Sequence, residues 1–146
     1  MSSAPSVAMR PPVEEPAPTI TEASRPGAQA FRILQAAFVV APILAGLDKF
    51  LHLMTNWDKY LAPLINEMIG GRGPLLMKGV GVIEIAAGIG VLWKPRVFAY
   101  VVVLWLWAIV FNFILIPGYF DIMVRDIVLS IAALALGRLS VEYDRS

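Results

Sequence analysis

Four apolar segments, each long enough to cross a bilayer as a helix, constrain this chain more than any other feature. They cover residues 31–53, 74–93, 97–116 and 120–137, and a membrane-spanning helix needs about 20 mostly apolar residues. Turn residues separate them, with Lys94-Pro95-Arg96 before the third segment and Pro117-Gly118 before the fourth. Only 16% of the residues are charged, against about a quarter in a soluble domain. The sequence therefore predicts an all-α, integral membrane four-helix bundle over residues 31–140.

The two ends of the chain are predicted to be tails on the cytoplasmic side. Residues 1–30 hold six of the eleven prolines, mixed with Ser, Thr and Glu, and such a stretch is expected to form a disordered cytoplasmic tail. Residues 141–146 are predicted to form a short C-terminal tail. The Lys/Arg residues of short loops mark the cytoplasmic side, and here they favour the side of the two termini: Arg10, Arg25, Arg32, Lys94, Arg96, Arg138 and Arg145, against Lys59 and Arg72. We therefore expect a plasma (inner) membrane protein with both termini cytoplasmic.

The linker between the first two spans, residues 55–73, has an amphipathic pattern. At 100° per residue its apolar side chains fall within an arc of about 100°: Trp57, Tyr60, Leu61, Leu64 and Met68. The pattern predicts an interfacial segment with Trp57 and Tyr60 as anchors at headgroup level, in which Pro63 bends or restarts the helix. Such a segment could be a lid over the outer end of the bundle or a gate for a ligand.

Charged and polar residues inside the spans are the candidate site. Each charge costs about 2.5–3.5 kcal/mol on insertion scales and marks a functional candidate. The set comprises Asp48, Lys49, His52, Lys78, Glu84, Asn112, Arg125 and Asp126. Helix geometry places most of them in the outer third of the membrane, with Glu84 deeper as the best single functional candidate and His52 expected at the rim. In the last span, Asp126, Ser130, Ala133 and Gly137 share one face, which is predicted to point inward.

This polar cluster has two interpretations. It could be a structural ion-pair network in which each charge is compensated by a neighbour, with Asp48, Glu84 and Asp126 balancing Lys49, Lys78 and Arg125. It could instead be a pocket for a quinone-like headgroup, a small polar solute or a relayed proton. Trp105 and Trp107 lie in mid-span, where packing is the default explanation and contact with a quinone ring is the alternative.

Several kinds of chemistry are excluded by the residue counts. The chain has no cysteine and one histidine, which excludes disulfides, thiolate metal sites, iron–sulfur clusters and a catalytic thiol. We therefore expect no metal site, and no cofactor held within the chain, although quinone contact stays open. With a net charge of +1 and no basic run, the chain shows no signature of nucleic-acid binding.

The order of several short motifs resembles the DoxX-like family of small four-helix membrane proteins. The resemblance spans residues 32–140 and rests on Ala45–Phe50, Trp57–Pro63, Gly79–Gly88, Arg125–Ile127 and Gly137–Ser140. It implies membership of a family that includes a subunit of thiosulfate:quinone oxidoreductase and a membrane partner in another oxidoreductase assembly. The family supplies no agreed catalytic residues, so any catalytic residues stay unknown.

Three functions follow as hypotheses. The first is a cofactor-free or quinone-contacting subunit of a respiratory or redox membrane complex, whose partners are the lipid bilayer and other membrane or redox subunits. The second is a small-solute or proton-coupled transporter that depends on Glu84, and the third is a purely structural membrane scaffold. None of them is a stand-alone enzyme, and the first is at most a subunit of a quinone-linked oxidoreductase.

Overall fold

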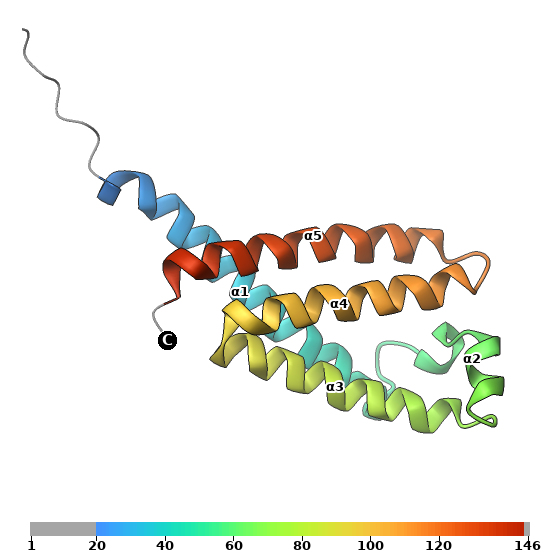
Figure 1. The fold of residues 1–146 in the computed structure, drawn as a ribbon. Coiled ribbons are helices and arrows are strands. Elements are labelled where there is room, and N and C mark those ends of the chain that lie inside the picture. The colour runs from blue at the N-terminus through green and yellow to red at the C-terminus, as the bar shows by residue number, and fades with distance from the viewer. Residues whose placement is uncertain (1–19, 145–146) are drawn as a thin grey trace, which may run out of the picture.

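The computed structural model describes residues 20–144, with the side chains of residues 20–25 excepted. Every regular element in this part of the chain is a helix. Four long helices lie alongside one another, and two short ones sit at the end opposite the start of α1 and the end of α5 (Figure 1). The elements are α1 (Ile20–Leu51), η1 (Trp57–Tyr60), α2 (Pro63–Met68), α3 (Gly73–Trp93), α4 (Pro95–Ile114) and α5 (Phe120–Tyr143).

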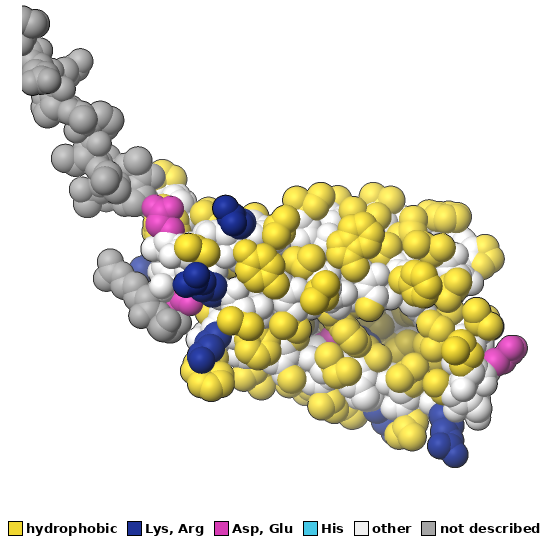
Figure 2. Space-filling view, in the orientation of Figure 1, with side chains coloured by type: hydrophobic (Ala, Val, Ile, Leu, Met, Phe, Trp, Pro, Cys, Tyr) yellow, Lys and Arg dark blue, Asp and Glu magenta, His cyan; other side chains and the backbone are white. Residues whose placement is uncertain are grey.

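Three of the described helices are long and apolar enough to cross a membrane: Pro26–Leu51 within α1, Gly73–Trp93 and Pro95–Ile114. The fourth long helix, α5, has 24 residues but more charge, because Arg125 and Asp126 lie in its second turn. Large apolar side chains face outward along these helices, and Figure 2 shows them covering one face with Lys and Arg near its two ends. Such a surface suits contact with a lipid bilayer.

The described helices begin and end close to the predicted spans, with one correction at the N-terminal side. Residues 20–30 belong to α1, whereas the sequence predicted a disordered tail there. Ala28, Gln29 and Ala30 are strong helix formers that extend the helix ahead of its apolar part. Residues 1–19, the rest of the predicted tail, lie outside the described residues. At the other end α5 continues to Tyr143, into the predicted C-terminal tail.

The helices form two closely packed pairs, α1 with α3 and α4 with α5, and the contacts between the pairs are sparser. Glycines let the backbones of α1 and α3 touch. A Cβ atom on Gly81 would lie 2.7 Å from the carbonyl oxygen of Gly46, and one on Gly88 would lie 2.8 Å from that of Val39. α3 and α4 diverge from their shared turn at Lys94, and η1 and α2 lie beside the wide end (Figure 1).

Replacing Gly81 with alanine should lower the free energy of unfolding by about 2 kcal/mol, because the added methyl group would force the α1 and α3 backbones apart. Gly79 is the matched control on the same helix, since a Cβ atom there would meet nothing within 4 Å. Gly79→Ala should be neutral or stabilising by up to about 1 kcal/mol through helix propensity. The measurement is an SDS unfolding titration in bicelles followed by circular dichroism. Equal effects of the two substitutions would contradict the close contact.

Candidate functional site

Asp48 organises the end of α1 and the start of the following segment. One of its carboxylate oxygens accepts hydrogen bonds from the backbone N–H groups of Leu53 (2.8 Å) and Met54 (2.9 Å). The other accepts the indole N–H of Trp57 at 2.7 Å. The carboxylate is buried, so these donors replace the water that a charged group needs. No Lys or Arg pairs with Asp48 within the described residues.

Lys49, the next residue, points to α3 and forms an ion pair with Glu84. Its Nζ lies 2.6 Å from Glu84 Oε2, and both side chains are buried, with 4% and 10% of their surfaces exposed. Lys49 faces Gly81, and a Cβ atom added at Gly81 would lie 3.2 Å from the Cβ atom of Lys49. The absence of a side chain at Gly81 therefore leaves room for the lysine stem to reach the next turn of α3.

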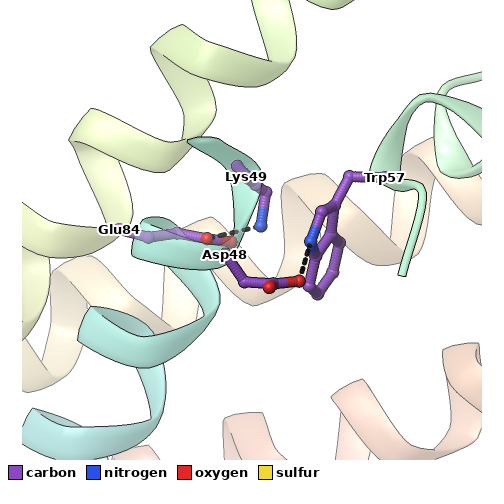
Figure 3. Close-up of polar contacts among 4 residues, drawn as sticks. All are labelled: Asp48, Lys49, Trp57 and Glu84. Carbon is purple, nitrogen blue, oxygen red and sulfur yellow. Dashed lines mark hydrogen bonds and ion pairs between the residues drawn. The ribbon is translucent and has the colours of Figure 1, made fainter. Parts of the chain in front are cut away.

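The indole ring of Trp57 covers this ion pair. Lys49 Nζ lies 3.8 Å from the ring centroid, the arrangement of a cation–π interaction. Figure 3 shows the resulting chain of contacts, in which Asp48 holds the Trp57 ring, the ring covers the ammonium group and the ammonium group binds Glu84. These four residues, called the Trp57 network below, join α1, η1 and α3.

Trp105 of α4 lies next to this network and has an unused donor. Its Nε1 is buried and has no hydrogen-bond partner within the described residues. The Trp105 indole and the negative charge of Asp126 are nevertheless both near enough to influence the Glu84 carboxylate electrostatically. The indole N–H therefore lies close to the Glu84 carboxylate without meeting the geometry of a hydrogen bond to any acceptor within the described residues.

Asn112 ties the short helices to α4. Its Nδ2 donates to the carbonyl oxygen of Tyr60 at 2.7 Å, and its Oδ1 accepts the backbone N–H of Ala62 at 3.0 Å. The Tyr60 ring packs edge-on against Phe113 and Tyr119, with centroids 6.0 and 5.4 Å apart. A hydrogen bond with the Thr55 side chain lowers the pKa of the Tyr60 phenol. Together with the contacts of η1 with α3, these interactions bridge α3 and α4.

Arg125 and Asp126 form the second ion pair of the described residues, on α5. Arg125 Nε lies 3.3 Å from Asp126 Oδ1, but 64% of the arginine side chain is exposed against 6% of the aspartate. The aspartate thus belongs to the interior, together with Ser130, Ala133 and Gly137 on the predicted inward face of α5. The arginine stem carries its guanidinium group outward.

Two further predicted site residues, Lys78 and His52, are exposed. Lys78 is exposed and forms no ion pair within the described residues, because it lies about 120° around α3 from Glu84 and its long stem leads outward. His52 is also exposed. It follows the last residue of α1 and has a φ of 53°, so its side chain does not continue the helix face that carries Asp48.

The predicted interfacial segment forms two short helices, η1 and α2. Pro63 begins α2, so the predicted restart of the helix at this residue is confirmed. Trp57 and Tyr60 are half-buried and point to protein groups, whereas Leu64 and Met68 of the same predicted face are 53% and 79% exposed. The restart separates the first two side chains from the last two, so one helical phase does not relate them.

Sequence reasoning did not identify Trp57 and Trp105 as members of the buried site. For Trp105, the sequence offered only a tryptophan in the middle of one span and a carboxylate, Glu84, in the middle of another. A tryptophan at such a position is equally typical of packing between helices. No group of three or more His, Asp or Glu residues in the described part of the chain could hold a metal ion. No protein-family model, curated protein or solved structure matches the chain.

Proposed function

We propose that this chain is a four-span membrane protein that contacts quinone as a cofactor-free subunit of a respiratory or redox membrane complex. The fourth span would be α5, whose polar residues Asp126 and Ser130 are buried while Val124, Val128 and Ile131 are more than half exposed. The Lys/Arg bias supports cytoplasmic termini in the plasma membrane. η1 and α2 would then lie at the outer end as a lid fixed by Asp48 and Asn112.

The unpartnered indole N–H of Trp105 carries the proposal. A buried donor without an acceptor costs about 1–3 kcal/mol, and native proteins have few of them. A ring carbonyl oxygen of a quinone would accept this hydrogen bond beside the Lys49–Glu84 pair. A quinone also has a flat ring and an apolar tail, so it can reach such a site through the bilayer, where Figure 2 shows the surface hollowed between α3 and α4.

The residues near the proposed quinone contact suggest a role for each side chain and for the partner subunit. When bound, quinone would accept two electrons from a redox centre of another subunit, together with two protons, and leave as the quinol. Trp105 would donate to a carbonyl oxygen, and the Lys49–Glu84 pair would supply a fixed dipole beside it in a region that excludes water. With no cysteine and only one histidine, the chain has few side chains for binding a metal centre, so another subunit would exchange electrons with the quinone. The resemblance to a family with quinone-linked members is consistent with this role.

Trp105→Phe should weaken quinone binding about 5- to 30-fold. A smaller aromatic ring replaces the indole and the N–H donor is lost, and the lost hydrogen bond costs about 1–2 kcal/mol. The measurement is equilibrium dialysis of a short-chain ubiquinone against nanodiscs that contain the protein, with empty nanodiscs subtracted. Trp107→Phe is the matched control, because Trp107 is on the same helix but 51% exposed, and it should bind like the unchanged protein. Equal binding by both variants would reject the assigned site.

A purely structural scaffold is the second candidate. It is favoured by the complete pairing of Asp48, Lys49 and Glu84 inside the protein. It predicts that no variant of the Trp57 network changes quinone binding except by unfolding the protein. The dialysis experiment therefore separates the two functions, since a scaffold binds no more quinone than empty nanodiscs do.

A further inference from the structure

A second feature with ligand-binding chemistry lies at the opposite end of the long helices from the Trp57 network. It is an open groove of about 660 Å³ where the start of α4 meets the end of α5. Its lining includes Arg96, Tyr100, Val101, Leu104 and Arg138. The groove is therefore basic at its rim and apolar along its wall.

The two arginines come from different helices, α4 and α5. Arg96 is in the first turn of α4 and Arg138 is near the end of α5, and both are exposed. Neither forms an ion pair within the described residues. Figure 2 shows Lys and Arg side chains gathered at this end of the surface. Two guanidinium groups facing one groove match a phosphate group, which accepts several charge-assisted hydrogen bonds.

The wall of the groove becomes apolar with distance from the arginines. Arg96, Tyr100 and Leu104 repeat every four residues on α4, so they form one stripe about 12 Å long. The Tyr100 ring packs against α5 at Gly137, where an added Cβ atom would lie 3.1 Å from the ring. Tyrosine is typical of the membrane–water interface. The order of cation, tyrosine and aliphatic side chain matches the order of phosphate, glycerol and acyl chain in a phospholipid.

We propose that this groove binds one anionic phospholipid, with its phosphate between Arg96 and Arg138 and an acyl chain against Val101 and Leu104. Charge complementarity selects this occupant. A zwitterionic lipid carries its own cation beside the phosphate, whereas an anionic lipid leaves the phosphate charge to the guanidinium groups of Arg96 and Arg138. The site is separate from the proposed quinone contact and goes beyond that function.

The test compares lipid retention by native mass spectrometry of the full chain released from bicelles that contain equal amounts of phosphatidylglycerol and phosphatidylcholine. The unchanged protein should retain one phosphatidylglycerol in preference to phosphatidylcholine. The double variant Arg96→Gln/Arg138→Gln should retain at least 10-fold less phosphatidylglycerol. The variant Arg96→Lys/Arg138→Lys should retain more phosphatidylglycerol than the double glutamine variant but less than the unchanged protein. Lysine keeps the positive charge but loses the bidentate geometry of arginine.

The matched control removes the same charge at the other end of the molecule. Arg72, which immediately precedes α3, and Lys78 in its second turn are exposed, and Arg72→Gln/Lys78→Gln should retain phosphatidylglycerol like the unchanged protein. Circular dichroism of each variant shows whether it is folded. The proposal is overturned if the groove variant retains phosphatidylglycerol normally, if the control loses as much, or if phosphatidylcholine is retained equally.

Discussion

Lys49→Met should lower the free energy of unfolding by about 3–5 kcal/mol, one of the two largest effects expected in this chain. The substitution keeps the stem that faces Gly81 and removes the ammonium group, so the Glu84 carboxylate is left buried without its cation. Breaking a buried ion pair by removing one partner has this cost because the remaining charge is uncompensated. The measurement is the SDS unfolding titration in bicelles described for Gly81.

The second partner provides the control for this prediction. The double variant Lys49→Met/Glu84→Met removes both charges and should be within about 1 kcal/mol of the unchanged protein. Lys78→Met, on an exposed lysine without an ion pair within the described residues, should change stability by less than about 0.5 kcal/mol. Additive effects in the double variant would show that the two side chains do not act as a pair.

Asp48→Ala should lower the free energy of unfolding by about 3 kcal/mol. The carboxylate accepts two backbone N–H groups and the Trp57 indole N–H, and hydrogen bonds to a charged group contribute more than neutral ones. Asp48→Asn should cost less than Asp48→Ala, because its amide oxygen keeps part of the acceptor set while its amide nitrogen cannot accept from Trp57. The same titration gives these values, and hydrogen exchange at residues 52–62 shows whether the segment loosens.

Asp121→Ala is the control for Asp48, because it removes an exposed carboxylate in the first turn of α5 and should cost less than 1 kcal/mol. A double-mutant cycle with Trp57→Phe isolates the bond between the two side chains. If Asp48→Asn and Trp57→Phe were additive, the hydrogen bond would not be what holds the ring over Lys49.

The long helices could be predicted from the sequence because their boundaries depend on local signals. Gly73 and Pro95 begin helices where the apolar runs begin, and the polar and small residues of α5 share a face that is buried. The meeting of Lys49 with Glu84 was only partly predictable. Helical phase placed Glu84 but not Lys49 toward the interior, and the partner of each charge depends on the register of α1 against α3, where Gly46 and Gly81 allow close contact.

The remaining site features depend on tertiary contacts that periodicity does not contain. The division of the linker at Pro63 could be predicted, but the hydrogen bonds of Asn112 and Asp48 that hold the linker are not visible in an amphipathic pattern. His52 lies one residue past the end of α1, so helical phase does not set its direction. The lack of a hydrogen-bond acceptor for Trp105 Nε1 within the described residues depends on the positions of the atoms around this nitrogen. Only a structure with side chains reveals these positions.

The most direct test of the proposed function is a mild-detergent purification of the tagged chain from its native membrane, with mass spectrometry of the bound proteins and lipids. The account predicts that quinone and a cofactor-bearing subunit co-purify with the chain. It also predicts that Trp105→Phe retains the subunit but loses most of the quinone, while Trp107→Phe retains both. Recovery of the folded chain without quinone and without a redox partner would contradict the account.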